Sequence, residues 1–258
     1  MKLLSVKNLT KNFGGLCAVS NVNMEINEQE LIGLIGPNGA GKTTLFNLLT
    51  GVYEPSEGTI ELQVKDKIVA IGGMKPYNVT KLGLARTFQN IRLFKNLTVL
   101  DNVKIAMNKN IKYGTIVGIL RLPKYFKEEK AIHEKAIELL KIINLEDKKD
   151  ELAKNLPYGD QRRLEIARAL ATEPKILFLD EPAAGMNPQE TTDLTDLIRQ
   201  IKTQFNLTVI LIEHDMSLVM TICERIYVLD YGSCIANGIP EEIKNNPRVI
   251  KAYLGEEI

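Results

Sequence analysis

The chain has 258 residues, of which 45% are hydrophobic and 25% charged, a composition typical of a globular protein with a sizeable core. Lysine and arginine total 33 against 32 acidic residues, so the net charge of +1 gives no indication of a nucleic-acid partner. The three cysteines, Cys17, Cys223 and Cys234, form no C-x-x-C pair, which argues against a disulfide framework or a zinc site. A reducing cytosol suits this cysteine usage.

Two segments are relevant to export and to membrane insertion. Residues 1–8 lack the apolar run and cleavage site of a signal peptide, so we expect that the chain is not exported. Residues 111–122 form the most apolar stretch, but they include Lys112 and Arg121 and are shorter than the ~20 apolar residues of a spanning helix. We predict that the chain does not cross a membrane by itself. Residues 111–122 then either pack on their own subdomain or contact a subunit or the membrane surface.

The first predicted elements are strands. Apolar and polar residues alternate with a strand period around Leu3, Ser5 and Lys7 and again around Val22, Met24 and Ile26, which predicts an antiparallel opening sheet.

A series of buried strands and helices follows. Residues 31–35 are continuously apolar and precede a glycine-rich turn and a helix from about Thr43, the order strand, loop, helix. Residues 176–179 and 209–212 are two more buried-strand runs, and residues 188–204 between them have a helical pattern. This alternation predicts a parallel sheet. Near the end, the residues Asn237-Gly238-Ile239-Pro240 indicate a turn before the last short helices.

The middle of the chain has a different pattern. Apolar pairs recur at helical spacing between residues 131 and 143, and no strand run appears from about 96 to 170. We therefore predict a helical subdomain at residues 96–170, inserted into an α/β core formed by residues 1–95 and 171–258.

A phosphate-binding motif, G-x-x-x-x-G-K-[ST], follows the first buried strand and opens a helix, which is the context it requires. Its backbone N–H groups and helix N-terminus suit phosphate, Lys42 reaches the outer phosphates from an exposed loop, and the Thr43 hydroxyl is available to Mg²⁺. The alternative is a glycine turn with a surface lysine. The predicted nucleotide-binding residues here are Gly36, Pro37, Asn38, Gly39, Ala40, Gly41, Lys42, Thr43 and Thr44.

Acidic and histidine side chains follow the other buried strands. Asp180 and Glu181 come after residues 176–179, where Asp180 would hold the metal through water and Glu181 would act as general base. His214 follows residues 209–212, where its ring could contact the γ-phosphate. The alternatives are a solvated strand end and a structural histidine. His133, in the charged helical middle, has no assigned role.

The motifs at residues 36–43, 86–89, 156–163, 180–182, 184–187 and 213–215 stand in the order found in ABC transporter ATPases, which the chain resembles over nearly its whole length. The resemblance implies an α/β fold: a P-loop NTPase core with an N-terminal antiparallel β subdomain and an inserted α-helical signature subdomain. It implies that ATP and Mg²⁺ are bound and that ATP is hydrolysed.

The resemblance also implies further site residues. Gln89 is then the glutamine that senses magnesium and the membrane subunit, a metal-side group beside Thr43 and Asp180. Phe13 stacks on adenine, although an aromatic ring near two glycines also suits simple packing. Residues 156–160, with Tyr158 and Gly159, form the signature loop that contacts the nucleotide held by the opposite protomer.

Within the family, residues 13–16, 87–94, 161–168 and 181–188 resemble the larger ATPase subunit of branched-chain amino acid importers. That resemblance implies a second ATPase subunit, two transmembrane permease subunits, indirectly an extracytoplasmic solute-binding protein, and a peripheral location on the cytoplasmic face of the membrane. Alternatives are a transporter for lipopolysaccharide, urea or another polar solute, or an ABC ATPase of cofactor assembly. A chromosome or ribosome factor is disfavoured, because the chain shows neither a long heptad run nor a second such domain.

Two residues depart from the common signature. Pro157 replaces a serine and Asp160 a glutamine, which removes a hydroxyl and adds a negative charge near phosphate. Proline is tolerated at the start of a helix, so we expect phosphate binding rather than folding to be affected. The departures predict that the two composite ATP sites of a dimer differ in activity.

Overall fold

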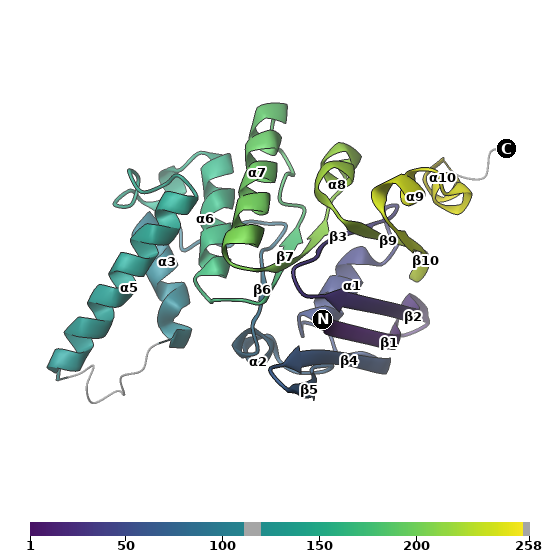
Figure 1. Cartoon of the computed structure of the whole chain (residues 1–258), viewed down its shortest axis with the longest axis horizontal. Helices are drawn as coiled ribbons and strands as arrows, with labels where there is room; N and C mark the ends of the chain where they lie inside the picture. Colours follow the sequence, from purple (N-terminus) through teal and green to yellow (C-terminus); the bar gives the residue numbers. More distant parts are fainter. Residues whose placement is uncertain (111–119, 255–258) are drawn as a thin grey trace. The chain divides into compact units, whose positions relative to one another are not determined.

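The computed structural model describes residues 1–110 and 120–254, which fall into two units (Figure 1). The first unit is Met1–Arg86 with Lys175–Ile258, and the second is Thr87–Pro174. Within the described ranges, no helix combines the length and apolar character that a bilayer-spanning segment needs. Residues 111–119, most of the apolar segment noted above, lie outside these ranges, so its packing or contact remains a prediction.

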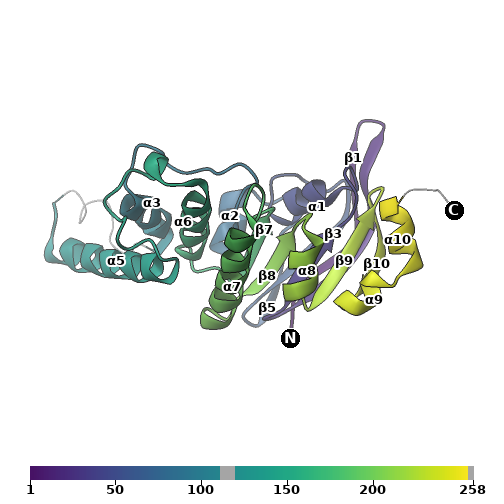
Figure 2. The same ribbon diagram turned by 90° about the horizontal axis from the view of Figure 1, so that it is seen from above.

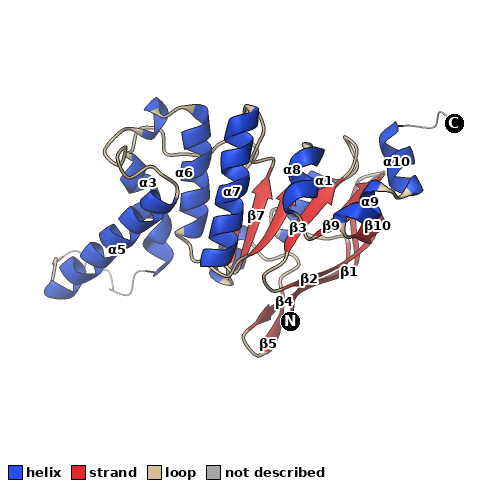
Figure 3. Cartoon of the chain, turned by 45° about the horizontal axis from the view of Figure 1, so that its top comes forward, coloured by secondary structure: helices blue, strands red, loops and turns tan. Residues whose placement is uncertain are grey.

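The first sheet of the first unit is antiparallel and has the order β2-β1-β4-β5, which confirms the predicted opening sheet (Figure 3). Its strands are β1 (Lys2–Phe13), β2 (Leu16–Asn27), β4 (Glu57–Val64) and β5 (Lys67–Ala70). In β2, Val22, Met24 and Ile26 are buried in alternation, as predicted. In β1 the predicted alternation of buried and exposed residues is wrong, because Leu3, Leu4, Ser5 and Val6 are all buried.

The second sheet has the order β10-β9-β3-β8-β7-β6, and all its neighbouring pairs are parallel except β9 with β10. Its strands are β3 (Leu31–Ile35), β6 (Leu84–Arg86), β7 (Ile176–Asp180), β8 (Thr208–Ile212), β9 (Arg225–Asp230) and β10 (Ser233–Gly238). Strands β3, β7 and β8 are buried throughout, as their continuous apolar runs predict. The turn predicted at residues 237–240 is wrong at Asn237 and Gly238, because both pair with β9, and Pro240 already begins the next helix.

The helices of the first unit begin at recognisable signals. The long helix after β7 starts with a capping box between Asn187 and Glu190, followed by Pro188 at its first position. Helix α8 is capped by the Asp215 carboxylate, and α7 and α8 pack side by side along the second sheet (Figure 2). The helices are α1 (Lys42–Leu49), α2 (Pro76–Lys81), α7 (Pro188–Gln204), α8 (Met216–Ile222), α9 (Pro240–Lys244) and α10 (Pro247–Leu254).

Helix α1 joins the two sheets through a shared apolar core. Leu45, Phe46, Leu48 and Leu49 of α1 are buried in one cluster with residues of β1, β2, β3, β7 and β8. The Phe46 ring packs edge-on against Phe178 of β7, with 5.3 Å between the centroids. This packing fixes the helix that begins at Lys42 against the strand that ends at Asp180.

The second unit consists of helices. Its elements are α3 (Val99–Ala106), η1 (Met107–Asn110), α5 (Pro123–Ile142), η2 (Ala153–Asn155) and α6 (Tyr158–Leu170). Helices α3, α5 and α6 contact one another and bury Val103, Ala136, Leu140 and Leu164. The predicted helical insertion is therefore present, as the fold class requires.

Candidate functional site

The loop between β3 and α1 is shaped by close backbone approaches. Gly36 has φ 152° and Gly41 has φ 95°. A Cβ at Gly36 would overlap the Leu229 carbonyl oxygen, and one at Gly41 would overlap that of Ala18. Only glycine therefore fits at either end of the loop, whose N–H groups precede the first turn of α1.

Lys42 is buried, which corrects the expectation of an exposed lysine. The residue is 6% exposed, and its Nζ donates hydrogen bonds to the carbonyl oxygens of Gly36 at 2.7 Å and Pro37 at 3.0 Å. Burial lowers the pKa of Lys42, and the negative charge of Glu181 opposes this shift. The Lys42 ammonium is partly desolvated and lies against a loop bounded by glycines, a position that suits phosphate binding. Phosphate oxygens would be stronger hydrogen-bond acceptors for it than the two carbonyls.

Two of the three groups predicted for Mg²⁺, Thr43 and Asp180, belong to the first unit. Thr43 lies exposed in the first turn of α1. Asp180 ends β7 and is 3% exposed. Hydroxyl and carboxylate oxygens are the ligands that Mg²⁺ prefers, with water completing the shell. Both donors therefore fit the metal.

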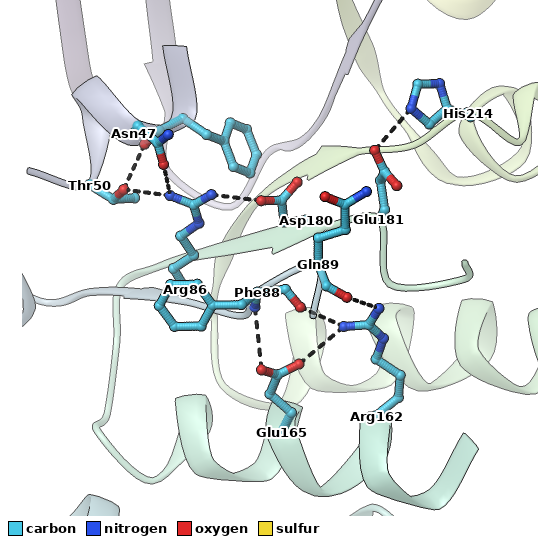
Figure 4. A network of polar contacts seen from close by, with 11 residues as sticks. Asn47, Thr50, Arg86, Phe88, Gln89, Arg162, Glu165, Asp180, Glu181 and His214 are labelled. Atoms are coloured by element: carbon cyan, nitrogen blue, oxygen red, sulfur yellow. Dashed lines mark hydrogen bonds and ion pairs between the residues drawn. The ribbon is translucent and has the colours of Figure 1, made fainter. Parts of the chain in front are cut away.

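Glu181 and His214 are in contact. Nε2 of His214 lies 2.9 Å from Oε1 of Glu181, as Figure 4 shows. The backbone N–H of Glu181 donates to the Ile212 carbonyl at 2.9 Å, and the residue has φ 47°, an uncommon conformation for a non-glycine residue. In register, Asp180 pairs with Ile212 and Ile212 with Leu34, so the loop after β3, the acids after β7 and His214 after β8 meet at one sheet edge.

Glu213 is a site residue that sequence reasoning missed. Its carboxylate, in a residue only 4% exposed, accepts hydrogen bonds from the N–H groups of Ala183 at 2.7 Å and His214 at 3.1 Å. Burial raises the pKa of Glu213, and the backbone hydrogen bonds lower it in part. The residue joins the segment after Glu181 to the one that carries His214. A charged residue directly after a buried strand was the available signal.

Arg86, quoted above only within a motif, also contacts the site. Its guanidinium donates to Asp180 Oδ2 and Asn47 Oδ1, both at 2.6 Å, and to Thr50 Oγ1 at 3.1 Å (Figure 4). The side chains of Arg86 and Asp180 are 9% and 4% exposed, so this ion pair is largely desolvated.

Phe13 lies at the end of β1 and is 42% exposed. Its ring packs edge-on against Tyr53 at 5.3 Å between centroids, and Lys11 Nζ lies 5.1 Å from its centroid. The exposed part of the ring is open to a planar ligand.

The remaining predicted residues belong to the second unit. Arg162 of α6 donates at 2.6 Å to the carbonyl oxygens of both Phe88 and Gln89, so the helix that follows the signature loop holds the Gln89 segment (Figure 4). Tyr158 and Gly159 begin α6, where Tyr158 is exposed and Gly159 partly buried, and Pro157 is the N-cap residue of the helix. The helix therefore tolerates the proline, as predicted.

Asp160 in the first turn of α6 is paired. Its Oδ2 accepts a hydrogen bond from Lys148 Nζ at 2.6 Å, and this contact raises the pKa of Lys148. The negative charge that distinguishes this signature loop therefore has a cation beside it in the same unit.

The chain is similar to known proteins along almost its whole length. The profile described as ABC transporter matches residues 19–184, and that of the branched-chain amino acid ATP-binding cassette transporter matches residues 233–258. The chain is 50% identical over 254 residues, 98% of each protein, to the high-affinity branched-chain amino acid transport ATP-binding protein LivG of Escherichia coli (strain K12). It is 46% identical, over the same shares, to BraF of Pseudomonas aeruginosa, a protein described in the same words.

More distant relatives and solved structures extend the comparison. The lipopolysaccharide export system ATP-binding protein LptB of Haemophilus influenzae is 34% identical over 100% of this chain and 99% of that protein. A nucleotide-free ATP-binding cassette of an ABC transporter superposes with a TM-score of 0.83 at 32% identity, covering 99% of this chain and all of the other. A cassette in its ADP conformation gives a TM-score of 0.84 at 31% identity and the same coverage.

A phosphate loop, an acid pair and a histidine at one edge of a parallel sheet, a helical insertion, and relatives matched along almost the entire chain lead to one assignment. The chain belongs to the ABC transporter family, as one of its ATP-binding and ATP-hydrolysing cassettes.

Proposed function

We propose that the described site binds MgATP in the manner expected from the sequence. The backbone N–H groups of the loop at residues 36–44, in which Pro37 has none, and the Lys42 ammonium hold the phosphates, and Phe13 stacks on the adenine. Thr43, Asp180 and Gln89 are the groups that would hold Mg²⁺, with Asp180 acting through water. When bound, the metal neutralises phosphate charge and orients the γ-phosphate.

Hydrolysis depends on Glu181 and His214. The Glu181 carboxylate accepts a proton from the attacking water as general base. His214 donates a hydrogen bond from Nε2 to the ionised carboxylate at 2.9 Å, which orients Glu181, and its ring is available to the γ-phosphate. This contact is the single observation that carries the hydrolytic assignment, because it joins two strand-end groups whose residues are 33 positions apart.

The active form is a head-to-tail dimer in which Tyr158 and Gly159 contact the nucleotide bound by the other ATPase subunit. The second subunit is a related cassette, and two transmembrane permeases complete the transporter. A peripheral location on the cytoplasmic face of the membrane follows from this assembly, as does indirect coupling to an extracytoplasmic solute-binding protein. No nucleic acid takes part.

The substrate we propose is branched-chain amino acids. LivG and BraF, named for that transport, are 50% and 46% identical to the chain, against 34% for the lipopolysaccharide relative. Lipopolysaccharide or urea transport, and cofactor assembly without a membrane partner, are the competing functions. The proposed site residues bind nucleotide rather than the transported solute, so the similarity to LivG and BraF supports this step.

Co-purification from the native membrane tests the assembly. The tagged chain should bring down a second cassette and two permeases, and proteoliposomes containing them should take up leucine when ATP and a cognate binding protein are supplied. Recovery of the chain without membrane subunits would contradict the transport function. Uptake of another solute but not leucine would contradict the substrate alone.

A further inference from the structure

Arg86 occupies a position from which one guanidinium reaches two elements of the site. It ends β6, next to β7 in the parallel sheet, where it pairs in register with Phe178. One terminal nitrogen donates to Asp180, and the other donates to Asn47 of α1 and to Thr50, the C-cap residue of that helix (Figure 4). The guanidinium carbon also lies 5.7 Å from the centroid of the Phe46 ring. The side chain is therefore held in place from three sides.

Arg86 joins strand β7 to helix α1, and each of these elements carries one of the groups proposed for Mg²⁺. Asp180 is one of them. Thr43 is the other, and it lies one helical turn before Asn47, so both side chains project from the same face of α1. A planar, permanently charged guanidinium can bond acceptors on both elements at once, which a lysine ammonium on a flexible stem does less well.

We propose that Arg86 is a positioning residue for the magnesium site. It orients the Asp180 carboxylate through Oδ2 and sets the spacing between that carboxylate and the first turn of α1. In this role Arg86 acts on the metal through Asp180, Asn47 and Thr50 rather than by binding the nucleotide itself. The inference rests on the proposed metal role of Asp180 and extends it to a residue without such an assignment.

The distinguishing measurement is the dependence of nucleotide affinity on magnesium. The loop amides and Lys42 hold ADP with or without the metal, whereas Asp180 and Thr43 act only when Mg²⁺ is present. The ratio of the ADP dissociation constant in EDTA to that in saturating Mg²⁺ therefore reports on the metal site, without reference to hydrolysis. A residue that merely stabilises the fold would shift both constants or neither.

The experiment measures this ratio by titrating the full-length chain with ADP. Arg86→Met should lower the ratio about tenfold, the effect of losing one hydrogen bond to a charged group, while affinity in EDTA stays within about twofold. Arg86→Lys, which keeps the charge but not the fork, should give an intermediate ratio. Asn47→Ala, which removes one acceptor on α1, should lower the ratio less than Arg86→Met does.

Arg225→Met is the matched control. It removes another partly buried ion pair of the first unit, with Glu30 at 2.7 Å, at the amino ends of the parallel strands. Its ratio should equal that of the wild type. A wild-type ratio in Arg86→Met, or equal losses with and without Mg²⁺, would overturn the proposal. If Arg86→Met does not fold, wild-type ratios in both Arg86→Lys and Asn47→Ala would overturn it.

Asp180→Asn distinguishes the positioning role of Arg86 from the metal role of Asp180 on which it rests. A wild-type ratio in Asp180→Asn would refute the metal role of Asp180 itself. A collapsed ratio in Asp180→Asn beside an unchanged one in the folded Arg86→Met would refute only the positioning role of Arg86.

Discussion

Nε2 of His214 lies within hydrogen-bonding distance of Oε1 of Glu181, at 2.9 Å, and the two residues follow adjacent strands of the same parallel sheet. The His214 side chain is 48% exposed and that of Glu181 15%. The pair is therefore open to a ligand on the histidine side and shielded around the carboxylate, an arrangement that suits a general base held by its neighbour.

Substitutions in this pair should separate binding from hydrolysis. Glu181→Gln should lower single-turnover ATP hydrolysis in the assembled transporter by about 10² or more, because the proton acceptor is lost, while ATP still binds. His214→Ala should also slow hydrolysis, and His214→Gln, which keeps a donor, should lie between Ala and wild type. Wild-type hydrolysis by His214→Ala would show that the contact has no catalytic role.

Lys42→Ala should weaken ATP binding by roughly 50–100-fold, since a charged hydrogen-bond donor to phosphate is lost. Because Lys42 also bonds to Gly36 and Pro37, a loss of about 1 kcal/mol in the free energy of unfolding should accompany it, or about 2–4 °C in Tm. Titration calorimetry and a thermal melt measure the two effects. Lys65→Ala, in the exposed β4–β5 turn, is the control. Unchanged ATP affinity in Lys42→Ala would refute the phosphate-loop assignment.

The two composite ATP sites of the transporter should differ. Glu181→Gln should reduce steady-state ATPase activity more than the same change in the partner cassette, because the other site uses the Pro157 and Asp160 signature loop of this chain. Equal losses would refute this asymmetry.

Lys148→Met tests the cation beside that signature loop. The substitution should leave the Asp160 charge without its cation. It should therefore reduce the rate of ATP hydrolysis at the composite site that uses this chain's signature loop. The measurement is the residual ATPase rate in the background of Glu181→Gln. No change on adding Lys148→Met would mean that the Asp160 charge does not act on phosphate.

Glu213 should make stability depend on pH. Its pKa is raised above the ordinary 4.5, so between 4.5 and the folded-state pKa the folded chain binds more protons than the unfolded chain. The contribution of Glu213 to the free energy of unfolding is therefore full below pH 4.5 and is lost as the pH rises through the folded pKa. In urea unfolding at a series of pH values, the wild type should lose stability relative to Glu213→Gln over that window. A pH-independent difference would contradict this.

Elements with their own local signals could be predicted from the sequence. Residues 188–204 form α7 with those bounds, because Asn187, Pro188 and Glu190 specify where the helix starts. The buried strands β3, β7 and β8 could likewise be predicted from their continuous apolar runs. The turn predicted at Asn237 and Gly238 was wrong because pairing with β9 outweighs the turn preference of these residues.

Candidate site residues could be chosen from the sequence, but the contacts between them could not. Lys42 is buried because its ammonium folds back on the loop, which no periodicity indicates. Arg86 meets Asn47 and Asp180, which are 39 and 94 positions away, only once β6, β7 and α1 have packed together. Long-range contacts of this kind depend on sheet order, which a single sequence does not specify.

The order of the second sheet also has a consequence during synthesis on the ribosome. Among the strands that the structure describes, β3, which leads into the phosphate loop, pairs only with β8 and β9, whose residues lie beyond position 207. A nascent chain released before that point has no partner for β3 and carries a continuous apolar run with unpaired backbone groups. Premature termination in the first four-fifths of the reading frame therefore yields an aggregation-prone fragment rather than a cassette with partial activity.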